Sequence, residues 1–225
     1  MKQFTIFANE SYLPLKNGGG RIPCLKKDTP AYYNSDYIGG LGRHTIKGTI
    51  ENLICTFKND ITRYSEEVMR AAKNHLYRIL LADLPQILND SAYSSLMVCV
   101  IPRAKHENYY DKEQKLFRFV IQYAIQNGLT GYVDGTHNII RHTDTATTHW
   151  THSGGSGGNG PMPYCGITND TCTISGVQGK DILLIDDLYT KKVGIDEDAI
   201  QALYDHGASS VCFYSIGRTI SKYTK

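Results

Sequence analysis

Three runs of apolar residues predict buried strands. They lie at 182–185, 96–101 and 211–216. Runs of four to six apolar residues are typical of strands that are covered on both faces, as in a parallel sheet. The first run ends in two aspartates, and the second ends in a proline followed by two basic residues. We expect a further short strand at 138–142.

Four other segments have apolar residues at the spacing of one helix face. We expect Asp60 to cap the second segment, and Pro85 to end it or to lie just beyond its end. Gly128 and Gly207 follow the third and fourth segments and supply stops. The segments are 46–58, 61–80, 111–126 and 195–206. The predicted inner face of the third consists of Leu116, Phe119, Val120, Tyr123 and Ala124.

The order of these elements predicts an α/β fold with a mostly parallel sheet and helices on both faces. This domain spans residues 43–225. Residues 1–42 are rich in Gly, Pro, Tyr and Asn, which predicts an irregular cover of short strands and turns over the core. Tyr32, Tyr33 and Tyr37 belong to this cover, where they either pack on the sheet or stack on a base.

The strongest candidate site follows the apolar run at 182–185. Asp186 and Asp187 come at the carboxyl edge of the predicted sheet, where α/β folds bind ligands. Carboxylates there accept hydrogen bonds from sugar hydroxyls or hold a hydrated magnesium ion. The next residues provide a hydroxyl, two cations and a flexible glycine ahead of a helix N-terminus, which suits a phosphate. They are Thr190, Lys191, Lys192, Val193 and Gly194.

Several observations bear on this hypothesis. Arg103 and Lys105 reach the same predicted edge and suit a second phosphate group, although basic residues are common after surface strands. Asp196, Glu197 and Asp198 favour the dipole of the following helix but compete with a bound anion. The alternative is that Asp186 and Asp187 are turn and cap residues and that the lysines are solvated.

The segment 182–199 resembles the phosphoribosyl pyrophosphate (PRPP) motif of type I phosphoribosyltransferases, with the pattern of the competence-type ComF branch. The family reads Thr-Thr-Gly-x-Thr where this chain has 190–194. The resemblance implies that Asp186 and Asp187 hold the ribose hydroxyls and Mg²⁺, and that 190–194 hold the 5′-phosphate. A further implication is that Arg103 and Lys105 contact the pyrophosphate.

The resemblance extends to the polar stretch 141–149, where His149 takes the place of the family's glutamine. The candidate catalytic residues are therefore Arg141 and His149, together with Asp186 and Asp187. The glycine-rich segment Ser153–Gly160 follows, and we expect it to be a lid that closes over PRPP, a surface loop or an engineered linker. His142, His149 and His152 with Cys165 and Cys172 match no standard zinc spacing.

Composition narrows the classes of function. The 225 residues carry a net charge of +2 with Lys and Arg spread along the chain, so nothing demands nucleic acid as a ligand. The six cysteines form no CxxC pair, which predicts reduced thiols and no counterpart of the N-terminal zinc module of ComF-like proteins. The apolar runs are too short to span a bilayer, and no signal peptide opens the sequence, so we expect a cytoplasmic protein.

Two functions remain at this point. The first is a PRPP-dependent phosphoribosyltransferase that transfers the phosphoribosyl group, with magnesium, to an unidentified base or amine. The second is a non-catalytic ComF-like accessory protein that binds a sugar phosphate or nucleotide and acts with a DNA-handling partner. A response-regulator receiver is excluded because only 38 residues follow Asp187. The oligomeric state stays open.

Overall fold

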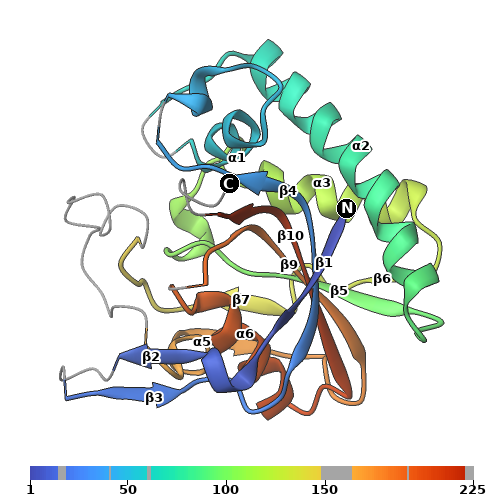
Figure 1. Cartoon of the computed structure of the whole chain (residues 1–225). Helices are drawn as coiled ribbons and strands as arrows, with labels where there is room; N and C mark the ends of the chain where they lie inside the picture. The colour runs from blue at the N-terminus through green and yellow to red at the C-terminus, as the bar shows by residue number, and fades with distance from the viewer. Residues whose placement is uncertain (15–18, 41, 60–61, 148–163, 192, 221–225) are drawn as a thin grey trace.

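A computed structural model describes residues 1–14, 19–40, 42–59, 62–147, 164–191 and 193–220 (Figure 1). Its centre is a six-stranded sheet in the order β1-β4-β10-β9-β5-β6, in which only the β1–β4 pair is antiparallel. The predicted mostly parallel sheet is confirmed. The strands of this sheet are β1 (Lys2–Ile6), β4 (Thr29–Tyr37), β5 (Leu96–Val100), β6 (Tyr132–Asp134), β9 (Asp181–Tyr189) and β10 (Ser210–Thr219).

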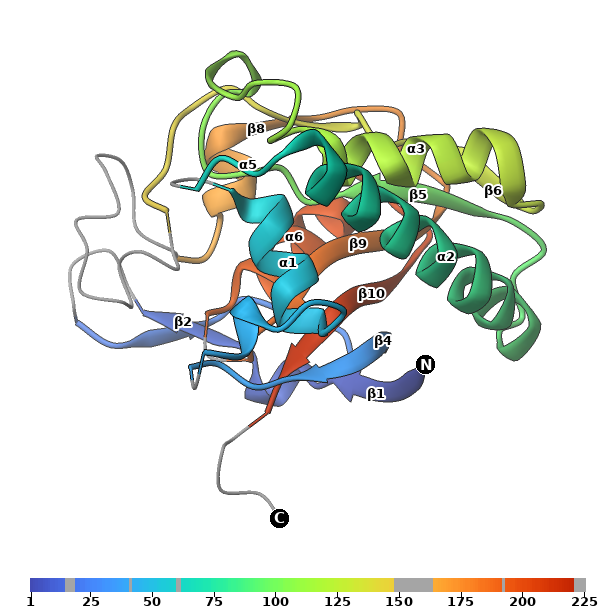
Figure 2. The same ribbon diagram turned by 90° about the horizontal axis from the view of Figure 1, so that it is seen from above.

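Helices cover both faces of the sheet (Figures 1 and 2). One face packs against α1 (Ile50–Lys58), α2 (Glu66–Asp90) and α3 (Leu116–Gly128). The other face packs against α6 (Ile195–Asp205). Short elements complete the described chain: η1 (Ala8–Glu10), β2 (Tyr12–Pro14), β3 (Arg21–Pro23), η2 (Arg43–Thr45), η3 (Glu107–Tyr109), β7 (Ile139–Arg141), α5 (Ile167–Thr171) and β8 (Cys172–Ile174).

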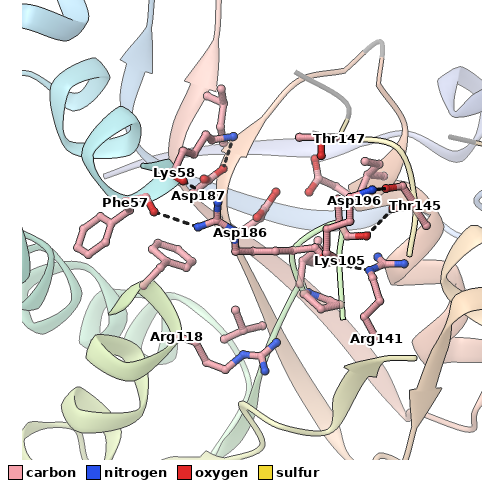
Figure 3. A pocket seen from close by; sticks show the side chains of 18 of the residues that line it. Phe57, Lys58, Lys105, Arg118, Arg141, Thr145, Thr147, Asp186, Asp187 and Asp196 are labelled. Carbon is pink, nitrogen blue, oxygen red and sulfur yellow. Dashed lines mark hydrogen bonds and ion pairs between the residues drawn. The ribbon is translucent and has the colours of Figure 1, made fainter. Parts of the chain in front are cut away.

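The strand order reverses direction between β5 and β9. The chain passes from β5 through α3 to β6 on one side, and from β9 through α6 to β10 on the other. Such a reversal leaves a crevice at the carboxyl ends of the two central strands, because their connections diverge to opposite faces. A cavity lined by residues of β5, β9 and the loops that follow them lies at this edge (Figure 3).

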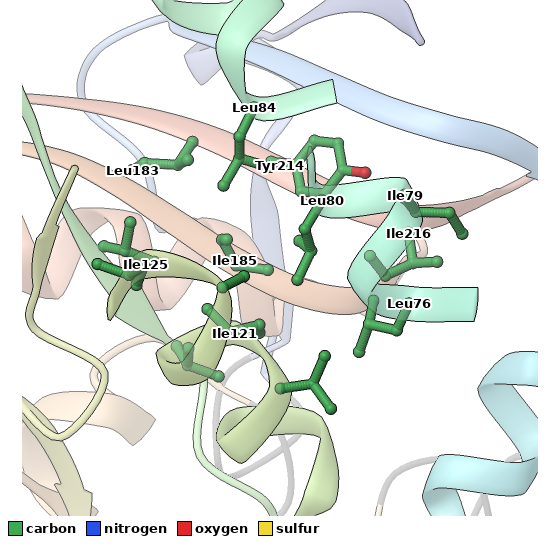
Figure 4. Close-up of a cluster of buried hydrophobic side chains, with 14 of the residues drawn as sticks. Leu76, Ile79, Leu80, Leu84, Ile121, Ile125, Leu183, Ile185, Tyr214 and Ile216 are labelled. Carbon is green, nitrogen blue, oxygen red and sulfur yellow. The ribbon is translucent and has the colours of Figure 1, made fainter. Parts of the chain in front are cut away.

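Alternation along β9 and β10 divides the core into two layers. Leu183, Ile185 and Tyr214 face the α1–α3 side, whereas Ile182 and Leu184 face α6. All five are fully buried. Figure 4 shows the first layer, with Leu76, Leu80 and Leu84 of α2 and Ile121 and Ile125 of α3 around Ile185 and Tyr214.

The N-terminal segment corrects the expected cover of residues 1–42. Two of its strands belong to the central sheet itself, because β4 pairs in parallel with β10 and β1 closes the edge. Tyr32 and Tyr33 are buried on that sheet, whereas Tyr37 lines the cavity. Short-range sequence patterns do not show a pairing between the first and last parts of a chain, which explains the error.

Two helices begin later than expected, α1 at Ile50 and α3 at Leu116, and three further expectations need correction. The second helix begins at Glu66, where Ser65 Oγ accepts from Val68 N at 3.4 Å, and the expected cap Asp60 lies outside the described residues. Pro85 lies inside α2, which continues to Asp90 because burial of Leu84 and Ile87 offsets one missing backbone hydrogen bond.

The third correction concerns α3. Phe119 and Tyr123 are about half exposed, and Ile121 and Ile125 occupy the inner face instead. Apolar residues surround most of this helix, so spacing alone allows two inner faces. None of the helices that the structure describes combines the length and apolar character needed to cross a membrane.

Candidate functional site

The cavity at the carboxyl edge of the sheet has a volume of about 590 Å³, within the usual range for a small-molecule site. Aromatic rings form part of its wall, and most of its charged residues are basic. The basic residues are Lys58, Arg103, Lys105, Lys115, Arg118 and Arg141, and the acidic ones are Glu107, Asp186, Asp187 and Asp196. The excess of cations favours a ligand that carries negative charge.

The predicted acidic pair lies in this cavity. Asp186 and Asp187 are strand residues, since β9 continues to Tyr189 instead of ending at the pair. Lys58, the last residue of α1, places its Nζ 3.2 Å from Asp187 Oδ1 (Figure 3). Burial lowers the pKa of Lys58, but the charges of Asp187 and Asp186 outweigh this effect and raise that pKa above its ordinary value. Lys58 is therefore an ammonium that offsets part of the acidic charge.

Asp186 interacts with a second buried carboxyl group, that of Asp196 on α6. Burial, with the charge of Asp187, raises the pKa of Asp186 to about 7. Asp196 is only 3% exposed, and burial beside Asp186 raises its pKa well above the ordinary value. Asp196 Oδ1 has no hydrogen-bond partner in the described part of the chain. Near neutral pH this corner of the cavity therefore retains protons instead of two full negative charges.

The other two acidic residues at the start of α6 have structural partners. Glu197 accepts a hydrogen bond of 2.8 Å from Tyr189 Oη. Asp198 accepts bonds of 2.6 and 2.8 Å from the backbone N–H groups of Gly166 and Thr168. Burial raises the pKa of both carboxyls. These residues hold neighbouring segments against α6, a role that the helix-dipole interpretation did not anticipate.

The expected glycine turn is present between β9 and α6. Val193 N donates to Thr190 O at 2.9 Å, and Gly194 has φ 76° as the residue that caps α6. A Cβ at Gly194 would lie 2.1 Å from a methyl carbon of Leu13, so both its conformation and its surroundings require glycine. Thr190 and Val193 line the cavity, and Thr190 Oγ1 is 2.7 Å from Thr219 Oγ1.

The lysines of this turn do not both reach the cavity. Lys191 is exposed and forms an ion pair with Glu10, outside the cavity lining. Its contact with a 5′-phosphate, expected from the sequence, would require the side chain to turn away from Glu10. Lys192 lies outside the described residues.

The basic loop after β5 also lines the cavity, but its residues are engaged with main-chain carbonyls. Arg103 donates to the carbonyls of Phe57, Lys58 and Gln114 at 3.2, 2.6 and 3.1 Å. It thereby pairs two of the carbonyls left open at the end of α1. Lys105 Nζ donates to Thr145 O at 2.6 Å. The loop thus joins α1 to the polar stretch after β7.

Arg141 is the last residue of β7 and begins the polar stretch 141–149. It is 6% exposed, lines the cavity, and donates through Nε to Arg103 O at 2.7 Å and through Nη1 to Thr171 Oγ1 at 2.6 Å. His149, His152 and the segment Ser153–Gly160 lie outside the described residues.

Lys58, Asp196 and Arg118 are lining residues that the sequence analysis did not select. In the sequence, Lys58 is only the last residue of a segment with apolar residues on one helix face. Arg118 sits within an apolar helix, where a single charged residue is a signal that could have found it. Asp196 was interpreted as a partner of the helix dipole.

The carboxylates of this cavity suit magnesium that is also held by the phosphates of a ligand. No cluster of three or more His, Cys, Asp or Glu side chains suited to a metal occurs among the described residues. Asp187 forms an ion pair with Lys58, and Asp186 lies beside the buried carboxyl group of Asp196. Mg²⁺ commonly binds one or two carboxylates and otherwise water and substrate phosphates, and the acidic pair suits that use.

The six cysteines are free thiols, as expected.

No model of a known protein family matches the sequence, and no curated protein matches it.

Proposed function

We propose that the cavity binds PRPP together with magnesium and that the protein transfers the phosphoribosyl group to a base or an amine. One observation carries the proposal. The acidic pair of β9, the glycine turn before α6 and the basic loop after β5 line one cavity at the point where the strand order reverses. A sugar bearing phosphates at two ends matches this order of carboxylates between an anion-binding turn and cations.

The 5′-phosphate is assigned to the turn 190–194. Backbone N–H groups of the turn and the first turn of α6 face an anion favourably. The acidic residues of that helix oppose this less than their number suggests, because Glu197 and Asp198 are directed to protein donors and burial raises the pKa of both carboxyls. Thr190 adds a hydroxyl.

The ribose hydroxyls are assigned to Asp186 and Asp187, and the pyrophosphate to Lys105 and the backbone of its loop. Arg103 supports that loop, because its guanidinium already donates to three carbonyls. Magnesium arrives with PRPP as part of the substrate and neutralises phosphate charge. Arg141 holds the same loop in place through a hydrogen bond to the carbonyl of Arg103.

The reaction needs no protein nucleophile. The bond from the anomeric carbon to the pyrophosphate oxygen breaks, and pyrophosphate leaves with that electron pair. The lone pair of an acceptor nitrogen forms the new bond, and the nitrogen then loses a proton. The contribution of the protein is to position both partners, stabilise the charge that develops on pyrophosphate and exclude water.

Isothermal titration with PRPP, ribose 5-phosphate and inorganic phosphate, each with magnesium, tests the assignment. We expect PRPP to bind most tightly, and Asp187→Asn to weaken PRPP and ribose 5-phosphate while leaving phosphate binding largely intact. Pyrophosphate release in the presence of candidate acceptors then measures turnover. Absence of binding by all three ligands would overturn the proposal.

The position of Lys191 supports a second candidate, a protein that binds the ligand without turning it over. Lys191 is paired with Glu10 outside the cavity, so the phosphate turn lacks one of its expected cations. Tight binding of PRPP with no pyrophosphate release for any acceptor would favour this candidate over the transferase.

A further inference from the structure

A second polar region lies in the same cavity, across from the acidic pair. Arg118 belongs to the first turn of α3, and Figure 3 shows it on the opposite side of the cavity from Lys58 and Asp187. Its side chain is only 15% exposed. None of the residues assigned to PRPP above belongs to α3.

The guanidinium of Arg118 is poorly satisfied by the protein. Its described partner is Glu107, whose Oε1 lies 3.5 Å from Nη1, an ion pair at more than a good hydrogen-bond distance. No hydrogen bond from Arg118 is present among the described residues. An arginine has five N–H donors, and a largely buried one usually has most of them paired. The donors of Arg118 therefore remain for a ligand.

The surroundings of Arg118 add positive potential. Lys115 immediately precedes α3, lines the cavity and lies at the positive end of the helix dipole. Burial lowers the pKa of Arg118, but arginine stays charged at neutral pH despite such a shift. An anion placed here gains from the guanidinium, the lysine and the helix terminus together.

Aromatic rings also line this cavity. Phe57 and Phe117 line the cavity and meet edge to face, with ring centroids 5.9 Å apart. Tyr110 also lines the cavity and is covered by the guanidinium of Arg103 at 4.5 Å. Flat ligands pack well against such rings, because aromatic pairs favour edge-to-face and offset arrangements.

We propose that Arg118, Phe57 and Phe117 form the acceptor end of the cavity and that the acceptor is a small planar molecule bearing a carboxylate. The role of this ligand as the acceptor rests on the proposed function. The carboxylate site itself rests on Arg118 and its neighbours alone. The guanidinium binds the carboxylate in a bidentate pair, and the ring lies against the two phenylalanines. Glu107 competes for the same guanidinium and limits the affinity.

Ligand-observed NMR titrations with benzoate and benzamide test this site, since the two probes share a ring and differ in charge. We expect the unaltered protein to bind benzoate at least about 10-fold more tightly, the preference typical of one charge-assisted pair. Arg118→Gln should abolish the preference, and Arg118→Lys should restore part of it. Glu107→Gln should strengthen benzoate binding a few-fold. Arg70→Gln, at an exposed position on α2 away from the cavity, is the matched control and should change nothing.

Thermal unfolding of each variant separates loss of binding from loss of fold. If Arg118→Gln is unstable, Arg118→Lys replaces it, and its preference for benzoate should be smaller than that of the unaltered protein. Equal binding of benzoate and benzamide by the unaltered protein, or a preference of undiminished size in the Arg118 variants, overturns the inference. Separate titrations of the unaltered protein with PRPP, ribose 5-phosphate and inorganic phosphate, each with magnesium, distinguish the two proposals. Arg118-dependent benzoate binding with no binding of these three ligands would support the carboxylate site and overturn the phosphoribosyl function.

Discussion

The two halves of β9 differ in what they do. The first half, Ile182–Ile185, is fully buried between α1–α3 on one side and α6 on the other. The second half places Asp186 and Asp187 in the cavity, where burial raises the pKa of Asp186 and where Lys58 offsets part of the charge. One half thus stabilises the fold, and the other holds charged groups at the expense of stability. This contrast is what a binding site built on a rigid strand requires.

Truncating the apolar half should have the largest effect on stability. Ile182→Ala removes a fully buried side chain, so we expect the free energy of unfolding to fall by about 2–5 kcal/mol. Urea denaturation measures the change. Ile140→Ala in β7 is the control, because Ile140 is 38% exposed and its loss should cost about 1 kcal/mol or less. Equal losses would show that β9 is not at the centre of the core.

The glycine turn between β9 and α6 should be the next most sensitive position. Gly194→Ala combines φ 76° with a Cβ at 2.1 Å from Leu13, and should cost about 2–4 kcal/mol. Gly179→Ala is matched in conformation, with φ 68°, but has open space around its Cβ. It should cost about 1–2 kcal/mol. The difference between the two variants isolates the contact with Leu13.

The polar half predicts a stability that depends on pH. The pKa of Asp186 is about 7 in the folded protein and near 4 in an unfolded chain, so the folded state binds the extra proton between these values. Stability from this group is therefore full below about pH 4 and is lost as pH rises through 7. The charged and titratable groups that face this carboxyl are Asp187, Asp196 and Lys58.

Asp186→Asn should remove this dependence. The variant should gain stability relative to the unaltered protein at pH 8, on the order of 2 kcal/mol, and show little gain at pH 4. Urea unfolding at the two pH values measures both effects. A gain of equal size at pH 4 and pH 8 would contradict a raised pKa for Asp186.

The smallest expected effect concerns the ion pair that joins α1 to β9. A double-mutant cycle with Lys58→Met and Asp187→Asn should give a coupling energy of about 1 kcal/mol, because both side chains are partly exposed to solvent. High salt should reduce it. A coupling energy near zero at low salt would mean that Lys58 does not offset the charge of the acidic pair.

Local patterns predicted the parts of the site that are contiguous in sequence. The apolar run before Asp186, the positive φ of Gly194 and the helix after it follow from residue types and spacing. The partners of these residues could not be predicted, because they arrive through tertiary contacts. Glu10 pairs with Lys191 across 181 positions, and Lys58 reaches Asp187 from a different helix.

The same limit applies to the rest of the fold. Alternating strands and helices predicted the parallel sheet, but not that the N-terminal β4 would pair with β10. In α3, apolar residues surround most of the helix, so spacing identified neither its inner face nor the place of Arg118 in the cavity. Periodicity identifies elements more securely than the neighbours that they find.

Crystals soaked with PRPP and magnesium are the most direct test of PRPP binding in the cavity. We expect electron density between β5 and β9, with the 5′-phosphate at 190–194, the ribose beside Asp186 and Asp187, and the pyrophosphate near Lys105. A ligand bound elsewhere on the protein, or a cavity that stays empty at saturating PRPP, would contradict it.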